Sequence, residues 1–492
     1  MAKMTPPPSG VKIRMYRQGF GDCFLLAFPT SEPDVAWYVL VDCGLFWAYS
    51  AVDGGPSQSE RMDAVVRDLE LATGGVIDTL VVTHEHFDHL AGFHWTDARD
   101  RFQQSFVYGE LWLAWTERRE GDALADELRE EAGLALGVLS QVQGLLPVGE
   151  LLDFSKNTAS ALVNARALFD EDRVRTLDPG EVVVPLGEGG PRFFILGPPR
   201  DRELLRTNLR EDELFARLRA AQRRAERDAL LAAARGHAGE ADDGAPFARH
   251  RGIRDQEASE SSFFVEHYGR PSADGQPDQQ AWRRIDGDWL EALADLALQY
   301  DDFVNNTSLA FAIELPESRR VLLFPGDAQS GNWLSWADEE EGFSFLDAPG
   351  VTVHDLLSRT VLYKVGHHGS HNATLDAKGL ARMTSDKLVA LVPTDEEWAW
   401  QKRRSGWRMP YLPLYRALLS RTRGRVVQSD IGLPDRKKKM APHPNHGGLP
   451  YSEADWEALQ GEIAALDATI QELHGRLVET DLFFEMTIPD EV

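Results

Sequence analysis

Val76-Ile77-Asp78-Thr79-Leu80-Val81-Val82-Thr83-His84-Glu85-His86-Phe87-Asp88-His89 is the stretch that decides the expected fold and chemistry of this chain. Its first part is a short apolar run rich in β-branched residues, which predicts a buried strand. Its last six positions hold three imidazoles and two carboxylates, which the strand would present on the loop at its end. In such a loop His84 and His86 would reach one metal ion. Asp88 and His89 would face a second ion, and nitrogen and oxygen donors without thiolate suit Zn or Mn in a catalytic site.

Two later apolar runs end in the residue types that a two-metal site still lacks. Residues 321–327 (VLLFPGD) predict a strand followed by Asp327, whose carboxylate could bridge two ions. Residues 361–370 (VLYKVGHHGS) predict another strand, which ends in a pair of imidazoles. We expect His367 to be the ligand because it is the first imidazole after the strand, but the pattern does not separate it from His368.

The H-x-H-x-D-H signature of the metallo-β-lactamase superfamily matches residues 84–89 without a gap, and the chain resembles that superfamily. Residues 19–26 and 39–44 resemble the two opening strands of its fold, with Asp42 as a carboxylate that orients a ligand without binding metal. Further segments follow the order seen in the hydrolase domain of the bacterial competence DNA-uptake channel and its soluble relatives: 195–199, 305–309, 326–327 and 367–370. The resemblance implies a four-layer αββα sandwich, with two mixed sheets between helical layers.

One ligand that many superfamily members possess has no obvious counterpart here, namely a further His between the first motif and the Gly-Asp. Four imidazoles lie in that interval: His94, His237, His250 and His267. The polar surroundings of His237 and His250 indicate surface positions, whereas the sequence leaves the other two open. In the resembling branch an Asn-Asn-x-Ser segment takes this place. We therefore expect Asn306 to line the site and one metal ion to be held more weakly.

The chemistry expected of such a site is hydrolysis by a metal-bound hydroxide, because two cations lower the pKa of a bridging water and stabilise the leaving oxyanion. Asp88 would hold and deprotonate that water. His368 would donate a hydrogen bond or a proton to the leaving group. Lys364 and Ser370 flank the His pair and could contact an anionic substrate, although Lys364 equally fits an ordinary lysine at a strand edge.

Composition predicts a globular protein of the cytoplasm, since 43% of the 492 residues are hydrophobic and 27% are charged. No apolar run approaches the roughly 18 residues of a membrane span, and the first residues have no apolar signal core. We therefore expect no membrane partner. Cys23 and Cys43 fall on neighbouring predicted strands and would be small buried residues, for which a disulfide is compatible but not required.

The formal net charge of −27 argues against a general nucleic-acid coat protein, because phosphate contacts come from Lys and Arg. Residues 402–439 nevertheless hold 12 basic residues against Asp430 and Asp435 alone, with Trp and Tyr interleaved. Such a basic stripe would suit a phosphodiester substrate, including nucleic acid, through charge and base stacking. It would equally suit a solvated face that balances acidic neighbours.

The chain divides where its composition changes. Residues 11–100 would form the first half of the fold, and residues 301–440 would form the second half with the Gly-Asp and His-His-Gly-Ser motifs. Residues 101–300 would be a helical and capping insert, interrupted by core strands near 180–198. Residues 441–492 would add a C-terminal helix and a final strand.

Helical patterns mark two parts of the insert and the C-terminal segment. Residues 124–146 and 204–234 have helical character, and residues 236–280 are polar and rich in Gly, Asp and Ser. Apolar residues between 456 and 477 repeat at steps of three and four, as in a heptad pattern of about three heptads. That seam could join a homodimer or a protein partner, or it could pack against its own domain.

Together these patterns predict an α/β fold that carries a dinuclear Zn or Mn hydrolase, with a phosphodiesterase or nuclease as the favoured activity. A lactonase, lactamase or thioesterase would use the same ligands with an apolar pocket and would not need the basic stripe. A partner-gated sensor or scaffold subunit of a bacterial multi-protein system is the alternative outside enzymes. Its contacts would be the acidic surface and the heptad-patterned segment.

Overall fold

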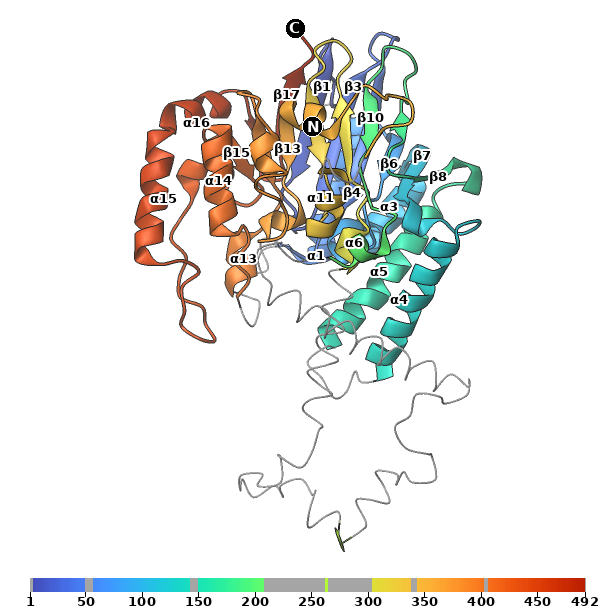
Figure 1. Cartoon of the computed structure of the whole chain (residues 1–492), viewed down its shortest axis with the longest axis horizontal. Helices are drawn as coiled ribbons and strands as arrows, with labels where there is room; N and C mark the ends of the chain where they lie inside the picture. The colour runs from blue at the N-terminus through green and yellow to red at the C-terminus, as the bar shows by residue number, and fades with distance from the viewer. Residues whose placement is uncertain are drawn as a thin grey trace. The chain divides into compact units, whose positions relative to one another are not determined.

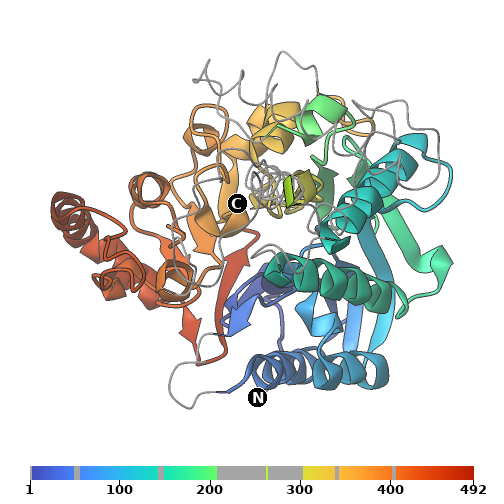
Figure 2. The same cartoon turned by 90° about the horizontal axis from the view of Figure 1, so that it is seen from below.

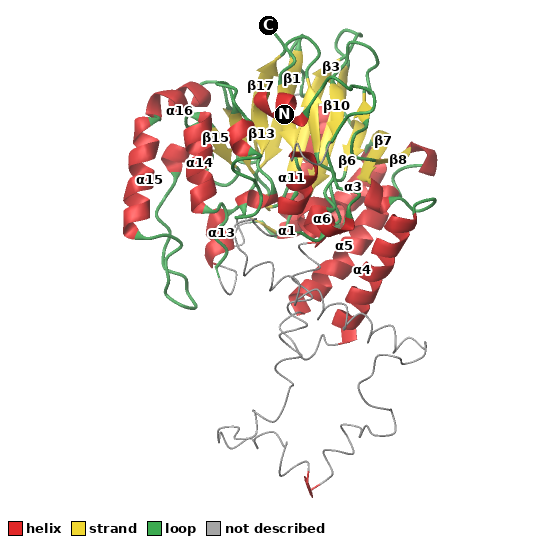
Figure 3. Ribbon diagram, in the orientation of Figure 1, coloured by secondary structure: helices red, strands yellow, loops and turns green. Residues whose placement is uncertain are grey.

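The computed structural model describes two large sheets flanked by helices (Figures 1 and 3). The described residues are 3–48, 56–141, 149–207, 262–263, 303–337, 343–401 and 406–491. Within them, no helix is both long and apolar enough to span a membrane. The α/β class expected from the sequence is confirmed, as a sandwich of two mixed sheets.

The first sheet has eight strands and contains both ends of the chain. Its strands, in spatial order, are β16 (Val478–Glu479), β17 (Phe483–Pro489), β1 (Gly10–Tyr16), β3 (Cys23–Pro29), β4 (Ala36–Cys43), β6 (Val76–Val81), β7 (Val107–Ala114) and β8 (Val174–Leu177). The strands from β16 to β4 are antiparallel, and those from β4 to β8 are parallel. The final strand therefore returns to pair with the first, which no local pattern could show. Cys23 and Cys43 are cross-strand partners, and both are buried free thiols.

The second sheet has seven strands and carries the later motifs. Its strands, in spatial order, are β15 (Val426–Gln428), β14 (Val389–Val392), β13 (Thr360–Lys364), β12 (Val321–Phe324), β11 (Phe311–Glu314), β10 (Arg192–Ile195) and β9 (Val182–Val183). The four strands from β12 to β15 are parallel, so their carboxyl ends meet at one edge. Two short strands, β2 (Gly19–Phe20) and β5 (Trp47–Ala48), form a separate antiparallel pair.

The two sheets share one apolar core. Aromatic rings interlock across it, with ring centroids 5.7 Å apart for Phe24 and Phe324 and 5.8 Å apart for Trp37 and Phe193. Both faces of the central strands are buried, which explains why β4 and β12 are continuous apolar runs without polar alternation.

Helices cover the outer faces of the two sheets (Figure 2). The helices of residues 58–205 are α1 (Gln58–Thr73), α2 (Phe87–Leu90), α3 (Thr96–Ser105), α4 (Ala123–Gln141), α5 (Gly149–Arg166) and α6 (Arg202–Leu205). Those of residues 330–422 are α11 (Ser330–Ala337), α12 (Val353–Ser358), α13 (Glu396–Gln401) and α14 (Leu412–Thr422). Helix α1 begins at a capping box between Ser57 and Glu60 and ends at Gly74 in the left-handed conformation, so its terminal backbone groups are satisfied.

The C-terminal segment contains two helices where the heptad pattern predicted one. α15 (Glu453–Ala465) and α16 (Asp467–His474) are separated at Leu466, whose backbone leaves the helical region. The seam residues Leu459, Ile463, Ile470 and Leu473 are buried in the core of the protein itself. The break is compatible with the apolar spacing because α15 packs against α14, and both short helices pack against the turn Pro434–Arg436.

The chain forms two compact units. The first comprises residues 1–126, 154–210 and 302–492, and the second comprises residues 127–153 and 211–301. Part of the interval expected to be an insert, including α3 and β7, thus belongs to the first unit. The expected helix at 204–234 and the polar stretch at 236–280 lie almost entirely outside the described residues.

Candidate metal centre

Hydrogen bonds to the end of β4 hold the loop that follows β6 in place. The Thr83 backbone N–H and hydroxyl both donate to the Asp42 carboxylate, at 2.8 and 2.7 Å. Gly44 lies directly under the loop, and a Cβ atom there would sit 1.7 Å from the carbonyl oxygen of Asp88. A side chain at Gly44 would therefore displace the loop. Hydrogen bonds and close packing between the ends of two neighbouring strands thus set the position of residues 84–89.

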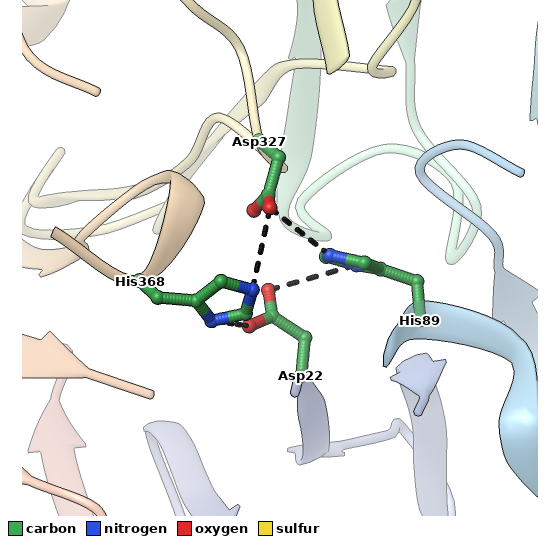
Figure 4. A group of neighbouring side chains, drawn as sticks. All are labelled: Asp22, His89, Asp327 and His368. Carbon is green, nitrogen blue, oxygen red and sulfur yellow. Dashed lines mark ion pairs between the residues drawn. The ribbon is translucent and has the colours of Figure 1, made fainter. Parts of the chain in front are cut away.

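Four ligand atoms converge at the carboxyl ends of these strands, and we call this place the four-ligand position. Its members are His89 Nε2, His368 Nε2, Asp88 Oδ2 and Asp327 Oδ2. The two imidazole nitrogens lie 3.3 and 3.5 Å from Asp327 Oδ2, and 3.9 and 2.7 Å from Asp88 Oδ2. The 2.7 Å contact between His368 Nε2 and Asp88 Oδ2 is a hydrogen bond, and the other three distances suit ligands around one cation. Figure 4 shows how His89 and His368 face Asp327.

The opposite edges of both imidazoles are already occupied. His89 Nδ1 lies 2.8 Å from Asp42 Oδ2, and His368 Nδ1 lies 2.7 Å from the carbonyl oxygen of Pro393. Because both partners only accept, each Nδ1 donates and each Nε2 is presented to the centre. His89 Nε2 and Asp327 Oδ2 are buried without a hydrogen bond, which is the state expected of atoms arranged for a metal ion. The contact of Asp42 with His89 is compatible with the orienting role predicted for Asp42, and its positive φ of 56° is a strain typical of functional sites.

Asp22 is a site residue that the sequence motifs did not single out. One oxygen or nitrogen atom each of Asp22, His89, Asp327 and His368 lies within 4.8 Å of the others, a group able to hold a metal ion. However, Asp22 faces the Nδ1 edges of His89 and His368, at 3.8 Å each, and forms an ion pair with Lys364. A cation that faced the two Nε2 atoms would therefore lie nearer to Asp88 than to the Asp22 edge of the rings. A Gly-Asp pair before a strand was the only available signal for Asp22.

Lys364 is an internal cation and does not lie at a surface edge. Its side chain is buried, and its ammonium group donates to the Gly326 carbonyl at 2.9 Å and to Asp327 Oδ1 at 3.1 Å, besides its pair with Asp22. The His367 backbone N–H donates to the same Asp327 oxygen at 2.9 Å. These contacts hold Asp327 with its other oxygen toward the four-ligand position. Lys364 is thus committed to two carboxylates and is not placed to bind a substrate.

The electrostatics of the four-ligand position favour positive charge. Burial opposes protonation of His89 and His368, but Asp327 together with Asp42 raises the pKa of His89 well above its usual value. Asp327 and Asp88 likewise raise the pKa of His368. Burial would raise the pKa of Asp88 and Asp327, yet the neighbouring cations hold both below the usual range. A bound cation would take the place of these protons.

A second, weaker place for a cation lies between His84 and His86, and we call it the two-imidazole position. His84 Nε2 is 3.1 Å from His86 Nδ1, and the ring centroids of His84 and His89 are 4.1 Å apart. Burial lowers the pKa of both His84 and His86, so both imidazoles stay neutral and available as ligands. The buried Asn305 side chain lies beside His86, and neither of its amide atoms makes a well-formed hydrogen bond.

Asn305, rather than the expected Asn306, is thus the residue that lines the centre. The side-chain oxygen Oδ1 of Asn306 accepts from the Gln329 backbone N–H at 3.1 Å, and its Nδ2 donates to the Thr207 carbonyl at 2.8 Å. Asn306 therefore ties the start of α11 to a neighbouring loop. The error arose because adjacent residues point in different directions, which only the backbone conformation determines.

The structure places His368 at the four-ligand position, where His367 was expected, and directs the His367 ring to Ser370. His367 Nδ1 lies 2.8 Å from the Ser370 hydroxyl, which also donates to Asn372, so Ser370 positions His367 and is buried away from the centre. Positive φ angles of 43° and 51° at His367 and His368 turn the second imidazole inward. Two successive residues in this uncommon conformation cannot be anticipated from strand periodicity.

Of the remaining imidazoles of the interval, the structure describes His94 alone, and its ring is directed to Ser160 and not to the centre. His94 Nδ1 contacts the Ser160 hydroxyl at 2.9 Å. His237, His250 and His267 lie outside the described residues. No imidazole of the described residues between the first motif and Asp327 therefore completes the two-imidazole position.

Four of the nine described cations of the basic stripe are paired with carboxylates. Residues 402–405, which include three of its cations, lie outside the described residues. Three of the others form ion pairs, namely Arg416 with Glu462, Arg436 with Glu479 and Lys437 with Glu396. A fourth pair joins Lys439 and Glu453. These pairs match the interpretation of a face that balances acidic neighbours better than an open groove for a polymer.

An aromatic wall, composed of Phe20, Trp398 and Trp407, flanks the metal centre. The ring centroid of Phe20 lies 4.1 Å from that of His368 and 5.2 Å from that of Trp398. Trp407 follows at 6.0 Å from Phe20. The wall joins segments that are far apart in sequence, so no motif predicted it.

Comparison of the chain with models of protein families and with curated proteins gives no match.

Proposed function

We propose that this protein is a metal-dependent hydrolase with the metallo-β-lactamase fold, acting on a phosphodiester. The observation that carries the proposal is the convergence of two imidazole nitrogens and two carboxylate oxygens at the four-ligand position. Two neutral imidazoles lie beside it, as a second cation would require. The order of motifs along the chain and the αββα layering support the superfamily assignment.

A divalent cation at this centre would supply Lewis-acid polarisation and lower the pKa of water, the chemistry that removes the need for a protein nucleophile. Among the carboxylates, Asp88 has a side chain 10% exposed against 1% for Asp327. Asp88 is therefore the group placed to orient an attacking water. Asp327, fixed by Lys364 and the His367 backbone, serves as the inner carboxylate.

The described surroundings favour a small phosphodiester over a polymer. A polymer needs a continuous track of free cations, and four of the nine described cations of residues 402–439 are paired with carboxylates, which interrupts such a track. The aromatic wall beside His368 suits an apolar or aromatic leaving group. It also makes hydrolysis of an ester or lactone the second candidate, since the same ligands serve that reaction.

A panel of substrates tests the proposal. We would measure hydrolysis of bis(p-nitrophenyl) phosphate, p-nitrophenyl acetate, a lactone and labelled DNA and RNA by the protein supplied with Mn or Zn. We expect turnover of the small phosphodiester, lost in Asp327→Asn. Preferential turnover of the lactone or acetate would replace the phosphodiester assignment. Failure to turn over any substrate, with metal bound, would contradict the hydrolase proposal.

A further inference from the structure

A separate cavity, which we call the basic cavity, opens at the opposite end of the second sheet from the metal centre. Its volume is about 360 Å³, within the range of small-molecule sites. Val361 and Val389 form part of its floor, near the starts of β13 and β14, whereas His368 and Pro393 follow the ends of these strands. Met486 of β17, from the first sheet, closes it on another side. The basic cavity is therefore no part of the metal centre.

The rim of the basic cavity is positively charged in a strongly acidic protein. Five cationic side chains line it against two carboxylates, Asp386 and Glu472. The cations are Arg320, Lys387, Arg423, Arg425 and Arg476. Only Arg476 has a carboxylate partner, Glu472 at 3.8 Å, among the described residues. The cavity thus has a local excess of three positive charges, although the chain carries a net charge of −27.

Backbone carbonyls hold two of these guanidinium groups without neutralising them. Arg425 donates to the carbonyls of Leu388, at 3.1 Å, and Asp386. Arg320 donates to the carbonyl of Pro489 at 2.5 Å. The positions of these charges are therefore set before any ligand arrives, which reduces the entropy that a ligand must offset.

Two further cationic side chains lie close to the other cations of the rim and can turn toward a ligand. Arg423 and Lys387 are exposed, and neither has a side-chain partner among the described residues. Burial and the neighbouring Arg423 lower the pKa of Arg425, a sign that like charges repel at this rim. An anion bound between them would relieve this repulsion and accept charge-assisted hydrogen bonds.

We propose that the basic cavity binds a small organic phosphate, with its phosphate groups on Arg423, Arg425 and Lys387 and its apolar portion over Val361 and Val389. Guanidinium groups match phosphate geometry through paired hydrogen bonds. The apolar floor gives such a ligand an advantage over inorganic phosphate, because it buries a ring or an alkyl chain. This site is independent of the hydrolytic centre and of its substrate.

Calorimetric titration of the full chain with ADP, pyrophosphate and adenosine tests the proposal. ADP supplies both the phosphates and an apolar ring, so we expect it to bind tightest, followed by pyrophosphate and then adenosine. The variant Arg423→Glu should weaken ADP binding by at least about tenfold, the equivalent of one charge-assisted hydrogen bond. The matched control Lys438→Glu makes the same charge change at an exposed lysine outside the cavity and should leave ADP binding unchanged.

Three outcomes would overturn the proposal. One is an absence of saturable ADP binding at millimolar concentration. Another is an equal loss of binding in Arg423→Glu and Lys438→Glu, which would show attraction by overall charge alone. The third is binding of an oligonucleotide or an anionic vesicle without binding of ADP, which would make the rim a surface for a polymer or a membrane. Hydrolysis at the metal centre should be unchanged in both variants, so failure here does not bear on the hydrolase assignment.

Discussion

The two places for a cation in the metal centre differ in charge and in the number of ligands. At the four-ligand position two carboxylates face two imidazoles; Asp327 raises the pKa of both His89 and His368, together with Asp42 for His89 and Asp88 for His368. At the two-imidazole position burial leaves His84 and His86 neutral, and the nearby amide of Asn305 adds no charge. A cation is therefore stabilised far more at the first place than at the second. The centre should bind one metal ion tightly and a second one weakly.

The largest effect is expected from Asp327→Asn, which removes the carboxylate on which the four-ligand position depends. Loss of a metal ion costs several kcal/mol of transition-state stabilisation, so activity should fall on the order of a thousandfold. Metal content, measured by mass spectrometry, should fall with it. Asp430→Asn, another buried carboxylate after a strand, is the control and should retain metal. Full metal binding by Asp327→Asn would contradict the ligand assignment.

A paired substitution at the two adjacent imidazoles tests which of them completes the four-ligand position. His368→Ala should lose the tightly bound ion, because His368 Nε2 faces Asp88 and Asp327. His367→Ala should retain it, with metal affinity reduced by roughly tenfold at most, since its ring contacts Ser370. Titration with Zn in the presence of a competing chelator would measure both. The reverse order of effects would restore His367 as the ligand.

Asn305→His is expected to change metal binding at the two-imidazole position alone. An imidazole here would add a third nitrogen ligand beside His84 and His86, and three protein ligands are typical of catalytic zinc sites. The second equivalent of Zn should bind about tenfold or more tightly, while the first is unaffected. Asn305→Ala, which removes the amide without adding a ligand, is the matched control. If the unmodified protein bound the first and second equivalents of Zn with equal affinity, the expected difference between the two positions would be wrong.

The smallest effect concerns an acidic cluster just beyond Pro393, the residue that fixes His368. Burial, followed by the nearby Asp430, raises the pKa of Asp395 to about 8. Between about pH 4 and 8 the folded state holds a proton that the unfolded state has released, so the free energy of unfolding should decrease as the pH rises through this window. Asp395→Asn should flatten that dependence and be more stable than the unmodified protein at pH 9.

Urea denaturation of both proteins at pH 5 and pH 9 would measure this difference. Asp481→Asn, at an exposed acidic residue, is the control and should not alter the pH dependence. A parallel pH dependence of unfolding in the unmodified protein and Asp395→Asn would show that Asp395 is ionised throughout. Repeating the measurement with metal bound would show whether the cluster and the four-ligand position are energetically coupled.

The fold and the centre could be predicted to different extents. A strand that ends in ligand residues is a local feature. The apolar runs that precede the motifs in the sequence therefore predicted β6, β12 and β13. The parallel pairing of β12 with β13 brings the carboxyl ends of these two strands to one edge, whereas β6 belongs to the other sheet. The pairing of β17 with β1 joins the two ends of the chain, and no local pattern indicates it.

Among individual residues, the sequence predicted that His89, Asp88 and Asp327 would come together, because each follows an apolar run and the order of motifs resembles that of the metallo-β-lactamase superfamily. It did not determine which member of the His367/His368 and Asn305/Asn306 pairs faces inward. Neighbouring side chains point in different directions, and positive φ angles and contacts from other elements decide which one is buried. Asp22 and Lys364 form an ion pair inside the centre only because strands distant in sequence pack together. Tertiary structure decided these choices, since burial of a charge is tolerated only where folding supplies its partner.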